Sequence, residues 1–456
     1  MKTSTTILAA STATAVLAGP TQQLVPRASS TGSASVPTVT VKGNAFYAGQ
    51  DRFYIRGVDY QPGGSSQVSD PIADENGCNR DISEFQKLGI NTVRVYTVDN
   101  TANHDACMNA LAKAGIYLAL DVNTPKYSLN RAEPKESYND VYLQNIFATI
   151  DAFAKYSNTL LFFSGNEVIN SDNTTTAAPY VKAVTRDMKQ YIGSQGYRSI
   201  PVGYSAADVD SNRYEMATYM NCGTDDQRSD FFAFNDYSWC DPSSFQQSGW
   251  SAKVQQYSNY SIPLFLSEYG CITNGRQFQE VASLYSTQMT NVYSGGLVYE
   301  YSQEGNGYGL VTLNGNSVSE DKDFSALQAA YKKTPNPSGD GGATSNGAAS
   351  SCPAQSSTWD VSNDALPAIP VPAEKFMTQG AGKGQGLGGS GSQDAGTGSS
   401  GTATAGSGAV TATSANKGAS NSGSAASSVM VPSMSLASLL PVAVVFFSTL
   451  AGAALL

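Results

Sequence analysis

The stretch Leu160-Leu161-Phe162-Phe163-Ser164-Gly165-Asn166-Glu167 joins an apolar run directly to an amide and a carboxylate. An apolar run without alternating polar residues is typical of a strand buried on both faces, as in a parallel sheet. The stretch Tyr180–Ser194 follows it and places apolar residues at three- and four-residue steps, which predicts a helix. This part of the chain is therefore expected to be one strand–helix unit with polar groups at the carboxyl end of its strand.

The same unit recurs between Val39 and Tyr331. Short β-branched or aromatic runs predict eight strands, at Phe53–Tyr60, Thr92–Tyr96, Tyr117–Val122, Leu160–Gly165, Ile200–Tyr204, Phe231–Asn235, Pro263–Ser267 and Gly296–Tyr301. Amphipathic stretches predict helices at Asp81–Leu88, Asp105–Ala114, Val141–Tyr156, Tyr180–Ser194 and Phe278–Val292, with Gly89 and Gly115 where C-caps belong. Eight βα units in about 290 residues predict an α/β fold, a (β/α)8 TIM barrel. A doubly wound sheet is the alternative, but the first strand is followed by Gln61-Pro62-Gly63-Gly64 and not by a GxGxxG turn.

Composition separates the barrel from the rest of the 456-residue chain. Residues 338–428 are mostly Gly, Ser, Ala and Thr, and their large apolar residues are confined to a patch between Trp359 and Phe376. Most of this region buries too little apolar surface to offset the entropy lost on ordering. We therefore expect the barrel at residues 38–335, a post-barrel segment at 336–376, and a disordered, O-glycosylated low-complexity stalk at 377–421.

Charge and histidine content exclude several classes of function. Lys and Arg number 27 against 37 Asp and Glu, which gives a net charge of −10 and a pI near 4.7. This is the wrong sign for a phosphate backbone, so nucleic acid is not an expected partner. His104 is the only histidine, so a metal site built on several imidazoles is impossible and a Ser-His-Asp triad could use only that residue. We expect no metal and no cofactor, and chemistry that rests on carboxylates, tyrosines and amides.

Both ends of the chain resemble targeting segments. Residues 1–18 carry Lys2, then an apolar run too short to span a bilayer, then small residues at a cleavage position, which predicts a secretory signal. A buried helix is the alternative, but the run has no amphipathic face. Residues 422–456 pass from small residues through a spacer to an uncharged apolar tail, which predicts a glycosylphosphatidylinositol (GPI) signal, removed on attachment at Asn421. A tail-anchored membrane protein is the alternative. With a GPI signal, we expect the protein to be secreted and anchored to the outer face of the plasma membrane, or transferred to the cell wall.

The cysteines fit this extracellular route. Cys78, Cys107, Cys222, Cys240, Cys271 and Cys352 form an even set, which predicts three disulfides in one of fifteen possible pairings. None is spaced as a CxxC pair, so zinc is not expected. Asn173-Thr174-Thr175 and Asn259-Tyr260-Ser261 are acceptor sequences for N-glycosylation, at Asn173 and Asn259.

Two glutamates each follow an apolar strand directly. Glu167 and Glu268 are 268 − 167 = 101 residues apart, the length of three βα units, so their strands can face each other across the barrel mouth. Two carboxylates in this position can cleave a glycosidic bond, one protonating the leaving oxygen and the other attacking the anomeric carbon. Asn166 beside the first can hydrogen-bond the sugar 2-OH. The alternative is that both glutamates form ion pairs with arginines such as Arg56 or Arg94.

Other polar and aromatic residues also lie at the predicted strand ends. A cleft lined by tyrosines suits the apolar faces and hydroxyl edges of sugars, although aromatics in barrels more often simply pack. Function is favoured over packing for Tyr96, Tyr237 and Tyr299, and the two are held equal for Tyr60 and Tyr301. Asp121 is either an acceptor for a sugar hydroxyl or the partner of an arginine at the rim.

Six segments together resemble a known family. They are Arg94-Val95-Tyr96, Gly165-Asn166-Glu167-Val168, Ile200-Pro201-Val202-Gly203-Tyr204-Ser205, Asn235-Asp236-Tyr237-Ser238-Trp239-Cys240, Leu266-Ser267-Glu268-Tyr269-Gly270-Cys271 and Ser294-Gly295-Gly296-Leu297-Val298-Tyr299. From about Val39 to Cys352 the chain resembles the fungal β-1,3-glucanosyltransferases of glycoside hydrolase family 72. The Gly-Asn-Glu triplet alone is common to many retaining barrel glycosidases, but six segments in order are specific.

The resemblance implies an enzyme that remodels the cell wall. It would cut a β-1,3-glucan chain internally and join the new reducing end to the non-reducing end of another chain, so donor and acceptor glucan chains are the expected partners. It implies Glu167 as acid/base, Glu268 as nucleophile, and glucan contacts at Gln61, Tyr96, Asp121, Asn166, Tyr237 and Tyr299. It implies the disulfides Cys78–Cys107, Cys222–Cys352 and Cys240–Cys271, the second of which would tie the post-barrel segment to the barrel. Some members carry a cysteine-rich carbohydrate-binding module, for which this chain has no spare cysteines.

The expected reaction is retaining. Glu268 forms a glycosyl-enzyme while Glu167, kept protonated by burial and by nearby negative charge, protonates the leaving oxygen and then deprotonates an incoming sugar hydroxyl. A monomer is expected. One rival is a retaining β-glucanase that mainly hydrolyses, and the other is a wall glucan-binding protein whose barrel is inactive.

Overall fold

The computed structural model describes residues 35–345, 347–362, 365–403 and 410–411. The expected signal peptide, Asn421 and the GPI signal lie outside these residues. Within the described residues, no helix combines the length and the apolar character that crossing a bilayer requires.

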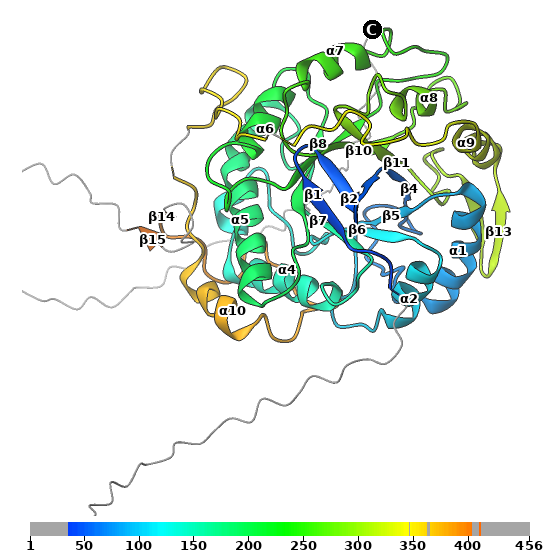
Figure 1. Cartoon of the computed structure of the whole chain (residues 1–456). Helices are drawn as coiled ribbons and strands as arrows, with labels where there is room; N and C mark the ends of the chain where they lie inside the picture. The colour runs from blue at the N-terminus through cyan, green and yellow to red at the C-terminus, as the bar shows by residue number, and fades with distance from the viewer. Residues whose placement is uncertain (1–34, 346, 363–364, 404–409, 412–456) are drawn as a thin grey trace, which may run out of the picture. The chain divides into compact units, whose positions relative to one another are not determined.

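Eight parallel strands close into a barrel, which confirms the fold predicted from the sequence. In chain order they are β4 (Ile55–Asp59), β5 (Thr92–Val95), β6 (Tyr117–Asp121), β7 (Thr159–Asn166), β8 (Val202–Ala207), β9 (Phe231–Asp236), β10 (Leu264–Tyr269) and β11 (Tyr293–Val298), and β11 pairs with β4 to close the ring. Helices surround this ring, as Figure 1 shows. The longer ones are α1 (Glu75–Leu88), α2 (Asp105–Lys113), α4 (Asp140–Phe153), α5 (Ala178–Ser194), α6 (Arg213–Met220), α7 (Trp250–Gln256) and α9 (Lys322–Lys333).

Local sequence explains where these helices begin and end. The Asp74 side chain caps α1 by accepting from the Gly77 N–H, and the Asn139 side chain caps α4 in the same way. Gly89 ends α1 with a φ of 73°, a left-handed conformation that a residue without Cβ adopts at little cost. The two N-caps end the connections that leave β4 and β6 at the barrel mouth, whereas Gly89 turns the chain back towards β5.

A small antiparallel sheet closes the amino-terminal end of the barrel. Its strands are β1 (Val39–Lys42), β2 (Ala45–Ala48) and β3 (Asp51–Phe53), and Figure 1 shows β1 and β2 in dark blue across the ring of strands. Phe46 packs on Phe231 and Phe265, with ring centroids 6.2 and 5.9 Å apart. Because Phe231 is the first residue of β9, this contact lies at the amino-terminal end of the strands and leaves the carboxyl end as the mouth.

Two sequence-based expectations differ from the structure in this region. The first predicted strand is divided at Tyr54 into β3 and β4, and β3 belongs to the small sheet. The helix predicted at Phe278–Val292 is reduced to α8 (Glu280–Leu284), after which the chain turns. The Ser286 hydroxyl bonds the Ser283 carbonyl at 2.7 Å, so a side chain competes with the helical hydrogen bonds there.

Three disulfides join the cysteines in the pairing that the family resemblance implied. They are Cys78–Cys107, Cys222–Cys352 and Cys240–Cys271. The second closes a loop over a sequence separation of 130 residues and ties the post-barrel segment to the end of α6. Beyond it, Trp359 is fully buried against Tyr219, with ring centroids 5.5 Å apart.

The expectation of a disordered stalk at residues 377–421 is wrong for residues 377–403. After α10 (Glu374–Gln379), which Figure 1 shows in orange near α4 and α5, the chain continues along the barrel. Gln144 donates to the carbonyls of Ala381 and Lys383, at 2.9 and 2.8 Å. Composition misleads here because a glycine-rich segment buries little apolar surface yet can be held by backbone hydrogen bonds. The rest of the expected stalk lies outside the described residues, apart from 410–411.

Candidate active site

Both glutamates lie at the carboxyl end of the barrel, where active sites of this fold are built. Glu167 follows β7 directly, and Glu268 is the fifth residue of β10. Glu268 is only 8% exposed, whereas Glu167 is half-buried. The two carboxylates therefore have different surroundings, which a pair with different roles requires.

Three donors hold the carboxylate of Glu268. Tyr96 Oη donates to Oε1 at 2.8 Å, Tyr237 Oη donates to Oε2 at 2.7 Å, and Arg94 Nη1 lies 3.3 Å from Oε1. Burial raises the pKa of Glu268 to about 7; the Arg94 charge lowers this pKa and the Glu167 charge raises it. The three donors thus fix the orientation of the Glu268 carboxylate, and burial disfavours its ionised form.

Glu167 is held mainly through its backbone. Its N–H donates to the Ser205 carbonyl at 2.9 Å, its carbonyl accepts from Arg131 Nη2 at 2.7 Å, and its Oε1 accepts from Asn235 Nδ2 at 2.9 Å. Its φ is 48°, a left-handed conformation that costs a non-glycine residue about 1–3 kcal/mol. The sequence suggested burial for Glu167, but the burial is found at Glu268, because Glu167 has already passed the end of its strand.

Arg94 connects the carboxylates below the mouth. Its five N–H groups are all used. The acceptors and distances are Asp121 Oδ2 (2.9 Å) and Oδ1 (3.3 Å), the Ser267 carbonyl (3.1 Å), Glu268 Oε1 (3.3 Å) and Asn166 Oδ1 (3.1 Å). Of the two interpretations of Asp121, the structure shows the arginine partner. Among the described residues only Glu268 forms an ion pair with an arginine, since Glu167 accepts from Arg131 through its backbone carbonyl. Arg56 donates instead to the carbonyls of Tyr331 and Thr334.

Asn166 is oriented through its oxygen. Oδ1 accepts from Ser205 Oγ at 2.7 Å and from Asn235 Nδ2 at 3.1 Å, in addition to Arg94. Among the described residues, its Nδ2 contacts no acceptor, so the amide N–H groups are available at the half-buried mouth. This orientation suits donation to a sugar hydroxyl.

Gln61 is a support beneath the mouth. Its Oε1 accepts from the backbone N–H groups of Tyr96 and Thr97 at 3.2 and 3.1 Å, and its Nε2 donates to the Ser69 carbonyl at 2.9 Å. The side chain is 1% exposed. It therefore fixes the position of Tyr96, which in turn bonds Glu268.

The tyrosines separate into a cluster at the mouth and a pair outside the site. Tyr237, Tyr299 and Tyr308 contact one another, with ring centroids 5.3 to 6.4 Å apart. The sequence indicated the first two and missed Tyr308, which lies in the loop after β11 and follows no strand. Tyr60 and Tyr301 instead donate to the buried carboxylate of Asp81 at 2.9 and 2.8 Å, so for these two the packing interpretation is right.

Asp59, at the end of β4, is a buried carboxylate at a predicted strand end to which the sequence pattern assigned no role. It pairs in register with Arg94 of β5, so both side chains point to the same face of the sheet. Among the described residues neither of its oxygens has a hydrogen-bond partner, because all five N–H groups of Arg94 are engaged elsewhere. Burial raises the pKa of Asp59 well above its usual range, Arg94 opposes this, and Glu268 adds to it. Burial therefore favours the protonated form of Asp59 over the ionised form.

This protonation predicts how stability depends on pH. Above about pH 4 the unfolded chain ionises this aspartate while the folded protein retains the proton, so folding stability falls with rising pH by up to about 1.4 kcal/mol per unit. Asp59→Asn cannot ionise, so its melting temperature relative to wild type should rise steadily from pH 4 to 7. Thermal unfolding across this range is the measurement. A flat or falling difference would show that Asp59 is ionised.

An exposed aspartate supplies the control for that measurement. Hydrogen bonds from Tyr156 and Lys155 lower the pKa of Asp105, so its contribution to stability is lost as pH falls through its folded pKa. This change lies below about pH 4, so the difference in melting temperature between Asp105→Asn and wild type should stay flat from pH 4 to 7, where that of Asp59→Asn rises.

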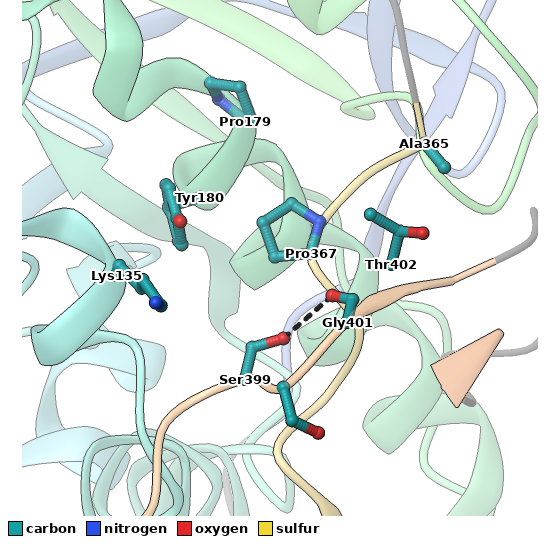
Figure 2. A pocket seen from close by; sticks show the side chains of 9 residues that line it. Lys135, Pro179, Tyr180, Ala365, Pro367, Ser399, Gly401 and Thr402 are labelled. Carbon is teal, nitrogen blue, oxygen red and sulfur yellow. Dashed lines mark hydrogen bonds between the residues drawn. The ribbon is translucent and has the colours of Figure 1, made fainter. Parts of the chain in front are cut away.

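Other candidate sites lie away from the carboxylates. Among the described residues, no group of His, Cys, Asp and Glu side chains could hold a metal ion. A pocket of about 450 Å³ lies between α5 and the C-terminal segment, and Figure 2 shows Tyr180, Pro367 and Thr402 on its wall. None of its lining residues is a carboxylate, so it offers no acid or nucleophile.

Asn173 and Asn259 are both exposed, as glycan acceptors must be.

Comparisons with known proteins relate the chain to one family. Residues 28–335 match the model of the glucanosyltransferases, glycoside hydrolase family 72. The chain is 67% identical to the 1,3-beta-glucanosyltransferase gel1 of Aspergillus fumigatus over 447 residues, 98% of this chain and 99% of the relative. It is 54% identical to the 1,3-beta-glucanosyltransferase GAS5 of Saccharomyces cerevisiae over 79% of this chain and 76% of the relative.

Solved structures of a further relative share the fold. A Gas2p variant of Saccharomyces cerevisiae in complex with laminaritetraose and laminaripentaose is 36% identical, with a TM-score of 0.67 over 74% of this chain and 75% of that chain.

Proposed function

The chain belongs to the glucanosyltransferase family, glycoside hydrolase family 72, and we propose that it cuts a β-1,3-glucan chain internally and joins the new reducing end to the non-reducing end of another chain. It is an enzyme that transfers β-1,3-glucan, as its relatives' names state for them. The observation that supports the residue roles is the contrast between Glu268, buried and held by three donors, and half-buried Glu167 at the facing strand end.

In the proposed first step, Glu268 attacks the anomeric carbon and Glu167 gives its proton to the leaving oxygen. The C1–O bond to the departing glucan breaks as the ester bond to Glu268 forms. Tyr96 and Tyr237 keep the attacking carboxylate in one orientation through hydrogen bonds of 2.8 and 2.7 Å. Asn166 Nδ2 donates to the sugar 2-OH, a contact that strengthens in the transition state.

In the second step, Glu167 acts as a base. It takes the proton from a hydroxyl of the acceptor glucan, whose oxygen displaces Glu268 from C1, so the free carboxylate is regenerated. The cluster of Tyr237, Tyr299 and Tyr308 provides apolar ring faces at the mouth on which an acceptor sugar can stack. An acceptor held there reacts at a far higher effective concentration than a freely diffusing one, which favours transfer over hydrolysis.

The same proposal includes the route of the protein to the cell surface. Residues 1–18 act as a secretory signal, residues 422–456 are replaced by a GPI lipid at Asn421, and the mature monomer carries glycans at Asn173 and Asn259. Three disulfides support an oxidising compartment. The barrel extends over residues 38–335, and the proposed stalk is confined to residues beyond 403.

Product sizing tests this function. The secreted protein is incubated with one end-reduced β-1,3-gluco-oligosaccharide, and the products are sized over time. We expect products longer than the substrate to appear together with shorter ones, because each transfer lengthens one chain by the fragment removed from another. Shorter products alone would make the protein a hydrolase. Binding to glucan without any product would make it a glucan-binding protein.

A further inference from the structure

The C-terminal strap, residues 381–403, lies against the β6–α4 loop, residues 122–139. Lys126 Nζ in the loop donates to the strap carbonyls of Leu387 and Gly389, at 3.0 and 3.1 Å. These contacts join segments more than 260 positions apart in sequence. A segment read from its composition as a stalk is therefore bound to a loop of the barrel mouth.

Further hydrogen bonds continue this contact along the loop to the start of α4. They run from the Ser392 N–H to the Lys126 carbonyl (3.0 Å), from Gln393 Nε2 to the Ser128 carbonyl (2.7 Å), from Asn139 Nδ2 to the Ser392 carbonyl (2.6 Å), and from the Asp140 N–H to the Thr397 carbonyl (3.1 Å). Most involve backbone groups, so they depend on the path of the strap more than on its side chains.

Glycines allow the strap to approach this closely. A Cβ on Gly389 would lie 2.0 Å from Tyr127 Oη, and one on Gly384 would lie 2.1 Å from Asn100 Oδ1. The Tyr127 side chain is 1% exposed, so its ring has no free space into which to move. Gly388 is a contrast, because a Cβ there would meet no atom within 4 Å.

The clamped loop carries Arg131, which donates to the Glu167 carbonyl at 2.7 Å. Glu167 has the left-handed φ of 48°, and such strain persists only where surrounding contacts hold it. Arg131 itself is exposed, so its position depends on the loop that carries it.

We propose that the strap braces the β6–α4 loop so that Arg131 holds the strained backbone of Glu167 in place. The strap is then a positioning part of the acid/base site. This inference rests on the proposed function of Glu167. It assigns to the glycine-rich segment a role in the geometry of the reaction and not only in attachment.

Two neighbouring glycines give a matched test in the full chain. Gly389→Ala should lower kcat for glucan transfer by roughly 10- to 100-fold with little change in KM, because misplacement of a reacting group costs about this much. Gly388→Ala should behave as wild type. Hydrogen exchange of the loop amides at residues 124–133 should accelerate in Gly389→Ala alone. Arg131→Met should lower kcat similarly, and the double variant should lose little more, because both changes act on one contact.

Several outcomes would overturn the proposal. One is faster exchange in the loop with wild-type kcat, and another is full additivity of the two substitutions. If Gly389→Ala does not fold, Lys126→Met removes both bonds to the strap carbonyls while keeping its apolar stem, and the same readouts apply. Absence of glucan transfer by the wild-type protein would contradict the proposed function. Hydrogen exchange of the backbone amides around Glu167, compared between wild type and Gly389→Ala, would still report whether the strap braces the Glu167 backbone.

Discussion

The Glu268→Gln variant should show no measurable glucan transfer, a loss of roughly 10⁴-fold or more, because an amide cannot form the glycosyl-enzyme bond. Its fold should remain intact. The amide can still accept from Tyr96 and Arg94, and the substitution removes a buried carboxylate whose pKa burial raises to about 7. Product sizing and thermal unfolding are the two measurements.

Glu167→Gln should lose about 10²–10⁴-fold with a natural glucan, the usual contribution of a general acid. The two variants should differ with a β-glucosyl fluoride donor, whose leaving group does not need a proton. With this donor Glu167→Gln should still release fluoride in a single burst as the glycosyl-enzyme forms, whereas Glu268→Gln should release none. Equal behaviour of the variants would contradict the assigned roles, and turnover of natural glucan at the wild-type rate by either variant would contradict the site itself.

Arg94→Lys should be the most damaging conservative change in the barrel. Lysine has three donors on a flexible stem and cannot reproduce the fork that reaches Asp121, Glu268 and Asn166 at once. Arg94 is fully buried and lies over the rings of Tyr96 and Phe163. Leaving a buried carboxylate without its partner costs about 3–5 kcal/mol, so we expect a comparable loss of unfolding free energy.

The activity of Arg94→Lys should fall even at temperatures where the variant is folded, because Glu268 and Asn166 each lose one of the three donors that orient them. Arg56→Lys is the matched control. Arg56 is also buried and bonds backbone carbonyls, but it touches neither glutamate. It should lower the melting temperature and leave kcat/KM of the folded fraction unchanged. Equal kcat/KM for the Arg94 variant and wild type would show that Arg94 only stabilises the barrel.

The sequence predicted the barrel and its two glutamates because apolar strands and the residues directly after them are local patterns. It could not identify the partners of those residues, which depend on which strands become neighbours. Asp59 and Asp121 look alike at strand ends, yet only Asp121 receives the Arg94 fork. Tyr60 and Tyr301 lie beyond the ends of β4 and β11, and both donate to Asp81 of α1, a partner that their own local sequence does not indicate.

Other elements escaped prediction for different physical reasons. The strands β1 to β3 are three or four residues long and too short to give a periodic signal. The strap has the composition of a linker, and its order comes from hydrogen bonds to residues far away in sequence. Tyr308 belongs to an irregular loop, where no rule of strand ends applies.

The small sheet at the amino-terminal end has a consequence for the order of events. Because Phe46 packs against Phe231 and Phe265 at the amino-terminal end, we expect sugar to approach the carboxylates from the mouth. The fragment released in the first half-reaction occupies the side of Glu167 from which the second chain must attack. The fragment has to leave before that chain enters. The donor therefore reacts and its released fragment departs before the acceptor binds. Initial rates against both substrates should therefore give parallel double-reciprocal lines, the kinetic pattern of a ping-pong exchange.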